Sequence, residues 1–275
     1  KYLLAGAFVL LVVVLIPGIG YEVNGSRRWI RLGFMNFQVS EATRVLLLLY
    51  VASYAVRRSD ELRSDFKAFM VPVGVLAAAA LLLLGEPDFG AATVLFATGL
   101  GVLFLAGARI VHLLVPVVAG SIGLAALAVV SPYRLRRLTG FLDPWGDPFD
   151  SGFQLVQSLI AIGRGEWLGV GLGASVQKLF YLPEAHTDFV FAVLAEEFGF
   201  LGVTVVVGLF ALLVTRALMI SREAAQAGQA YQSYVAAAIG IWLGLQAFVN
   251  IGVNMGLLPT KGLTLPLLSY GGSSM

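Results

Sequence analysis

Long apolar runs without charged residues constrain the fold of this chain more than any other feature of its sequence. Several reach about 18 residues, long enough for a helix to cross a hydrocarbon layer roughly 30 Å thick. Only 12% of the 275 residues are charged and 59% are hydrophobic, so too few charges are available to cover a soluble surface of this size. The sequence therefore predicts an all-α, polytopic helical membrane protein.

Seven segments are predicted to cross the membrane. They are Tyr2–Ile19, Phe37–Val56, Ala68–Leu84, Phe89–Ala108, Ile110–Val130, Asp188–Thr215 and Tyr234–Leu258. Between the fifth and sixth lies a hydrophilic loop, residues 131–187, whose Phe153–Ile162 section has a polar face typical of an amphipathic helix at the membrane interface. A connection this long in a compact bundle is usually functional.

Composition excludes some classes of function. The chain has no cysteine, which removes disulfides, thiol catalysis and cysteine metal sites. Its two histidines are too far apart in sequence for a zinc motif. The net charge of +2 is too small to argue for nucleic-acid binding.

Ionisable residues at the rim of a predicted span are candidates for function, because they are expensive to keep there. Glu184, His186 and Asp188 lie together where the sixth apolar run begins. Asp188 is the first candidate for a functional carboxylate. It could also cap a helix that starts at Phe189, and the two roles are compatible.

The second span must extend back through Arg44 and Glu41 to be long enough to cross. These residues are three apart and share one helix face, so an ion pair is expected. The spacing fits a pair lining a substrate cavity, and it equally fits an arginine that reaches the headgroups with a neutralising glutamate beside it.

Three further groups of polar residues have two interpretations each. Arg27, Arg28 and Arg31 could bind a phosphate-containing ligand or lipid headgroups. The turn Glu86-Pro87-Asp88 could line a polar site or be a solvated loop. Three amide residues spaced four apart form a polar stripe on the seventh span: Gln246, Asn250 and Asn254. This stripe could bind a ligand or form hydrogen bonds between helices.

Five motifs, in order along the whole chain, closely resemble the SEDS family (shape, elongation, division and sporulation). They are residues 27–33 (RRWIRLG), 37–41 (FQVSE), 86–90 (EPDFG), 182–189 (LPEAHTDF) and 267–274 (LLSYGGSS). Residues 143–148 (DPWGDP) and 259–266 (PTKGLTLP) look like the cell-division members rather than the elongation members.

The resemblance implies a single domain with ten transmembrane helices, of which two would precede Lys1 and one would follow Met275. It also implies a bacterial cytoplasmic membrane protein at the division septum. The arginine loop, the long loop and Asp188 would then face the periplasm or cell exterior.

The activity implied by the resemblance is polymerisation of lipid II into β-1,4 glycan strands, with inversion and release of undecaprenyl pyrophosphate. Asp188 matches the essential aspartate of the family, and we expect it to act as general base. Glu41 matches the acidic member of a cavity ion pair, with Arg44 where relatives often have lysine. The remaining residues expected to contact substrate are Arg27, Arg28, Arg31, Glu86, Asp88, Glu184, His186, Lys261 and Ser269.

The resemblance also implies partners: a class B penicillin-binding transpeptidase of the FtsI type, and the division proteins FtsQ, FtsL and FtsB. No organic cofactor is implied, and assistance from a divalent cation stays open. A lipid II flippase and a non-catalytic division scaffold stay open as alternatives. Lipid translocation without polymer would indicate the flippase, and a scaffold would not require acidic residues at the membrane rim.

Overall fold

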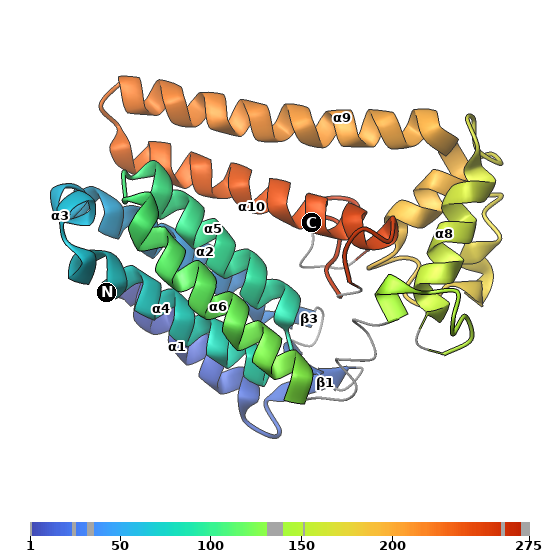
Figure 1. The fold of residues 1–275 in the computed structure, drawn as a ribbon, viewed down its shortest axis with the longest axis horizontal. Coiled ribbons are helices and arrows are strands. Elements are labelled where there is room, and N and C mark those ends of the chain that lie inside the picture. The colour runs from blue at the N-terminus through green and yellow to red at the C-terminus, as the bar shows by residue number, and fades with distance from the viewer. Residues whose placement is uncertain are drawn as a thin grey trace. The chain divides into compact units, whose positions relative to one another are not determined.

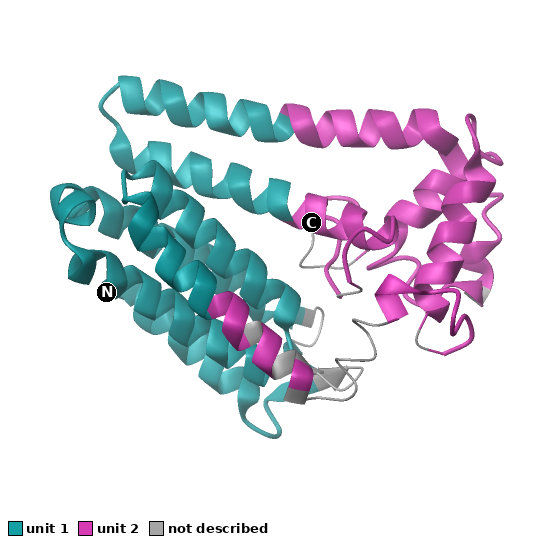
Figure 2. Cartoon of the chain, in the orientation of Figure 1, with its two compact units in different colours: residues 1–119, 213–245 teal, residues 120–212, 246–275 magenta. Residues whose placement is uncertain are grey.

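The computed structural model of the chain describes residues 2–23, 26–31, 36–130, 140–150, 152–259 and 262–270. The chain divides into two compact units (Figure 2). Unit 1 contains residues 1–119 and 213–245, and unit 2 contains residues 120–212 and 246–275.

Most described residues are helical (Figure 1). The α-helices are α1 (Tyr2–Leu15), α2 (Val39–Arg57), α3 (Ser59–Ser64), α4 (Phe66–Gly85), α5 (Phe89–Leu105), α6 (Ile110–Val130), α8 (Phe153–Gly165), α9 (Val190–Gln226) and α10 (Ala230–Asn254). A short π-helix, η1, covers Gln177–Tyr181. In unit 1 the core is apolar, with Leu47, Leu76 and Leu95 fully buried where α2, α4 and α5 pack together.

The predicted fold class is confirmed in its coarse form, a mostly helical membrane-type protein. Each of the seven predicted spans coincides with a helix: α1, α2, α4, α5, α6, α9 or α10. Within the described residues, α2, α4, α9 and α10 are long and apolar enough to cross a membrane. The apolar helices at Tyr2–Leu15, Phe89–Leu105 and Ile110–Gly123 are shorter. The count of seven spans stays a prediction.

A small antiparallel sheet was not predicted from the sequence. Its order is β1 (Gly20–Val23), β2 (Ser26–Arg31) and β3 (Asn36–Gln38), with Tyr21 opposite Trp29 and Ile30 opposite Phe37. Strand β2 carries the three arginines of the first loop. The pairing with β1 skips Arg28, because Tyr21 lies opposite Trp29 while Glu22 lies opposite Arg27, so the regular alternation of side chains is interrupted at this residue.

Helix α9 is interrupted at Gly199, whose φ of 62° and ψ of −161° are not helical. The loop after α8 satisfies the backbone groups that this break leaves open. Val170 N–H and Gly171 N–H donate to the carbonyls of Glu196 and Glu197 at 2.9 and 3.2 Å. In return, the N–H groups of residues 200 and 201 donate to the carbonyls of residues 166 and 167 at 2.9 and 3.2 Å. The loop and the two parts of α9 therefore form one hydrogen-bonded assembly within unit 2.

Gly165 allows this close approach, and it supplies a test. A Cβ at Gly165 would lie 1.9 Å from the carbonyl oxygen of Ala195, whereas one at Gly163, in the same helix, would meet nothing within 4 Å. Gly165→Ala should therefore destabilise the protein by about 1–3 kcal/mol or more. Gly163→Ala, the matched control, should be neutral or stabilising by up to about 1 kcal/mol. Thermal unfolding of both variants in detergent measures the difference, and equal effects would contradict this packing.

Candidate functional site

Arg28 joins strand β2 to the turn between α4 and α5. Its Nη2 donates to the carbonyl of Pro87 at 2.8 Å, and its Nε lies 3.6 Å from a carboxylate oxygen of Asp88. The other Asp88 oxygen accepts the N–H of Ala91 at 3.0 Å and so caps α5. Asp88 and Glu86 are both buried, so the interpretation of this turn as a solvated loop is wrong.

Arg44 and Glu41 form the expected ion pair, with 3.3 Å between Nη1 and Oε2. The Arg44 side chain is only 1% exposed, and its guanidinium lies 5.0 Å from the ring centre of Trp242 on α10. Protein therefore surrounds the guanidinium, which does not extend to the lipid headgroups as a snorkelling arginine would. A buried charge of this kind is held by its carboxylate and by the face of the indole ring.

The other two arginines of β2 differ from Arg28. The guanidinium of Arg31 stacks on the ring of Tyr21, 3.4 Å from its centre, and the residue is exposed. Arg27 is half-buried. Arg28 thus contacts the buried acidic turn, while a phosphate contact by any of the three arginines stays a prediction.

Glu86 is fully buried, and among the described residues neither of its carboxyl oxygens has a hydrogen-bond partner. Burial raises the pKa of this carboxyl from 4.5 to about 8; repulsion from Asp88 adds to the rise, and Arg28 opposes it. At neutral pH Glu86 is therefore mainly the uncharged acid. Loss of this proton would leave a negative charge on Glu86 that is buried and accepts no hydrogen bond among the described residues.

Asp188, in unit 2, is half-buried and lies just before α9. Amide groups of α10 hold its backbone carbonyl: Asn250 Nδ2 donates to it at 2.8 Å and Asn254 Nδ2 at 3.0 Å. Beside the carboxylate, a Cβ at Gly262 would lie 3.1 Å from Oδ2. The carboxylate is thus bordered by a residue without a side chain, while its backbone is fixed from α10.

The residues before Asp188 are held in the same way. Ser269 Oγ donates to the carbonyl of Thr187 at 2.6 Å and accepts the N–H of Leu265 at 2.7 Å, and Tyr270 N–H donates to the carbonyl of His186 at 2.8 Å. Ser269 is buried, so its hydroxyl stabilises the segment; its predicted contact with substrate is untested.

Glu184 and His186 are exposed, and Thr187 Oγ1 donates to the Glu184 carboxylate at 2.7 Å. The positive φ of Glu184, 57°, marks a tight turn, which the N–H of Thr187 closes by donating to the Glu184 carbonyl at 3.1 Å. Lys261 lies outside the described residues.

The polar stripe of α10 forms hydrogen bonds with the backbone. Besides the bonds to Asp188, Gln246 Nε2 donates to the carbonyl of Thr264 at 3.0 Å, and Asn250 Nδ2 donates to that of Leu263 at 2.6 Å. The stripe could bind a ligand or form hydrogen bonds within the protein, and the second interpretation accounts for the observed contacts of its side-chain amides.

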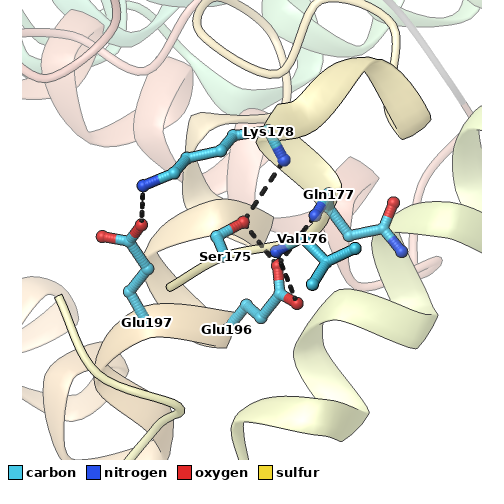
Figure 3. Close-up of polar contacts among 6 residues, drawn as sticks. All are labelled: Ser175, Val176, Gln177, Lys178, Glu196 and Glu197. Atoms are coloured by element: carbon cyan, nitrogen blue, oxygen red, sulfur yellow. Dashed lines mark hydrogen bonds and ion pairs between the residues drawn. The ribbon is translucent and has the colours of Figure 1, made fainter. Parts of the chain in front are cut away.

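Glu196 and Glu197 had no role assigned from the sequence, and they anchor residues 175–178, where η1 begins (Figure 3). The fully buried Glu196 carboxylate accepts Ser175 Oγ at 2.5 Å and the N–H groups of Val176 and Gln177 at 3.3 Å each. Lys178 Nζ donates to Glu197 at 2.7 Å. The partners are about twenty positions away, and no local sequence signal reports such contacts.

Metal binding is not evident in the described ranges. Within them, no three His, Asp or Glu side chains are grouped so that they could hold an ion. The question of a divalent cation therefore stays open.

The whole chain is similar to proteins of one family. A family model described as a cell cycle protein, of the FtsW, RodA and SpoVE type, matches residues 1–275. A protein of Thioalkalivibrio sulfidiphilus named "Probable peptidoglycan glycosyltransferase FtsW" is 60% identical over 99% of this chain and 68% of its own length. One of the same name from Coxiella burnetii is 56% identical over 100% of this chain and 74% of its own length.

Two solved structures have similar folds. One, titled "Structural coordination of polymerization and crosslinking by a peptidoglycan synthase complex", matches with a TM-score of 0.81 and 32% identity, over 100% of this chain and 75% of the other. The other is the rod shape determining protein RodA of Thermus thermophilus, with a TM-score of 0.69 and 31% identity, over 100% of this chain and 72% of the other.

The neutral state of Glu86 predicts a pH dependence of stability. The folded state keeps a proton that the unfolded chain releases, so this contribution is full below about pH 4.5 and is lost as the pH rises towards 8. Glu86→Gln cannot ionise, and its melting temperature should exceed that of the wild type at pH 8, with a gap that narrows towards pH 5. Glu223→Gln, an exposed control, should follow the wild type. Parallel curves for Glu86→Gln and wild type would refute the assignment.

The anchor at Glu196 predicts an asymmetry between two neighbouring glutamates. Glu196→Ala leaves the N–H groups of Val176 and Gln177 without their carboxylate partner, and should cost about 2–4 kcal/mol. Glu197→Ala removes a partly exposed ion pair with Lys178 and hydrogen bonds from the backbone N–H groups of Gly173 and Ser175. It should cost about 1–2 kcal/mol, less than the loss of the fully buried Glu196. Chemical or thermal unfolding in detergent gives the two values. An equal loss in both variants would show that Glu196 is not the main anchor.

Proposed function

We infer that this chain, which belongs to the FtsW/RodA/SpoVE family, is a peptidoglycan glycosyltransferase that polymerises lipid II. The observation that carries this function is the match to relatives bearing that enzyme name, at 60% identity over 99% of the chain. The family match over the complete range 1–275 supports it.

Asp188 is the catalytic base in this proposal. A sugar hydroxyl is a weak nucleophile, so a carboxylate within hydrogen-bond reach must take its proton as it attacks the anomeric carbon of the donor. The diphosphate leaves from the opposite face, which gives inversion in one step without a covalent enzyme intermediate. A half-buried carboxylate, bordered by Gly262 and carried on a firmly bonded backbone, suits this task.

Cationic side chains are proposed for the leaving group. The leaving diphosphate gains negative charge, and guanidinium groups can accept it with two parallel hydrogen bonds. Arg28 and Arg44 are each already oriented by a carboxylate, Asp88 and Glu41 respectively. We propose both as substrate contacts, together with Arg27, Arg31, Glu184, His186 and Lys261.

The topology completes the proposal. We propose that the chain forms one transmembrane domain with seven of ten spans, and that residues 131–187 form an extracytoplasmic loop at the septum. A transpeptidase partner is consistent with the solved complex, whose title joins polymerisation to crosslinking. FtsQ, FtsL and FtsB are proposed partners on the grounds of the division-type motifs.

Asp188→Asn tests the assignment. The full-length variant is reconstituted with its transpeptidase partner and supplied with lipid II. Its polymerisation rate should be at least about 100-fold lower than that of the wild type, because the amide cannot accept the proton. Asp150→Asn, which makes the same change at an exposed position of the long loop, is the control and should retain activity. Thermal unfolding and partner binding verify that both variants are intact.

Two outcomes would contradict the proposal. Polymerisation by Asp188→Asn at the wild-type rate would remove Asp188 from the role of base. Translocation of lipid II by the wild type without polymer would favour a flippase. A wild type that neither polymerises nor translocates lipid II would favour a scaffold.

A further inference from the structure

Asn254 lies between two backbone groups that would bond to each other in a regular helix. The carbonyl of Asp188 and the N–H of Ala192 are four residues apart, which is the spacing of an α-helical hydrogen bond. Instead, Asn254 Nδ2 donates to Asp188 O at 3.0 Å, and Asn254 Oδ1 accepts from Ala192 N at 3.2 Å. The Ala192 N–H also donates to the Phe189 carbonyl at 3.1 Å, a turn one residue tighter than an α-helical bond. The side-chain amide of Asn254 thus takes the place of the α-helical hydrogen bond between Asp188 and Ala192.

Asn250 strengthens the same contact. Its Nδ2 is the second donor to the Asp188 carbonyl, at 2.8 Å, and Asn254 Nδ2 also donates to the Asn250 carbonyl at 2.9 Å. Both asparagines are buried, with exposures of 1% and 0%. A carbonyl oxygen has two lone pairs, so α10 supplies donors for both acceptor positions of Asp188.

The consequence is that Asp188 stays outside α9, which begins at Val190. The direction of a side chain follows the backbone that carries it. If the amide of Asn254 were absent, the carbonyl of Asp188 and the N–H of Ala192 could pair directly. Helix α9 would then start earlier, and the Asp188 carboxylate would turn with the helical backbone.

We propose that Asn250 and Asn254 are positioning residues, which aim the Asp188 carboxylate by holding its peptide group out of the helix. This inference rests on the proposed function, in which Asp188 is the base. A base must lie within about 2.6–3.2 Å of the proton it abstracts, and a displacement of about 1 Å can lower the rate roughly 100-fold. The asparagines act on the rate through Asp188 and need not touch substrate.

The first experiment separates positioning from substrate binding. In the full-length protein with its partner, Asn254→Leu keeps the side-chain size but removes both hydrogen bonds. Its kcat for lipid II polymerisation should fall about 10- to 100-fold, with KM within about twofold of wild type. Gln246→Ala is the control, since that amide lies on the same helix face and donates to Thr264. It should change kcat less than threefold.

A second variant adds a pH profile. In Asn254→Asp the protonated carboxyl can both donate and accept, whereas the ionised form cannot donate to Asp188 O. The kcat of this variant relative to wild type should therefore decrease as the pH rises. A role in packing alone predicts a constant ratio.

A third measurement does not need activity. Residues 1–275 contain no cysteine, so a single cysteine at the exposed His186 can carry a spin label in protein cleared of cysteines elsewhere. The label should become more mobile in Asn254→Leu and stay unchanged in Gln246→Ala.

The outcomes are distinguishable. Unchanged kcat in Asn254→Leu, or a raised KM with kcat retained, would overturn the positioning role. If the wild type fails to polymerise lipid II, the proposed function fails, and the label then decides whether α10 still holds this segment. If the mobility of the label in Asn254→Leu equals that in the wild type, Asn254 does not hold this segment, and the positioning role is overturned as well.

Discussion

The need to satisfy every backbone polar group inside the protein governs the irregular parts of this structure. In a bilayer no water is available to an open N–H or carbonyl, so a helix can be interrupted only where protein supplies the missing partners. Around α9 those partners come from elsewhere in unit 2. The loop at 166–171 serves the break at Gly199, and Asn254 serves the start at Val190. Asp188, the proposed base, lies beside the second of these sites, and the anchoring residues Glu196 and Glu197 lie beside the first.

Buried charge is handled in three different ways. Glu86 is neutral near pH 7, and Arg44 is paired with Glu41 and packs on an indole ring. Glu196 accepts hydroxyl and N–H donors and lies 3.6 Å from Arg164 Nη1. Removing one partner of a buried pair is more harmful than never having had the pair. This applies to the pair of Arg44 with Glu41.

The sequence could predict what depends on composition and on near neighbours. Apolar length located the helices that coincide with the seven predicted spans, and three-residue spacing indicated the Glu41–Arg44 pair. The sheet was missed because its strands are short and mix arginine with aromatic residues. The bonds of Asn250 and Asn254 to Asp188 join residues 62 and 66 positions apart, and no periodicity within one segment contains that information. The motif resemblance pointed to Asp188 without explaining what holds it.

The interruption at Gly199 also changes how the amino-acid pattern of α9 must be read. In an unbroken α-helix each residue is rotated by about 100° from the last, so the facing of all its side chains follows from any one of them. At Gly199 that angular phase is reset. Residues 190–198 can therefore turn Glu196 and Glu197 towards the 175–178 segment independently of residues 200–226, whose apolar side chains are largely exposed. A helical-wheel projection of the whole 190–226 stretch superimposes two wheels and describes neither.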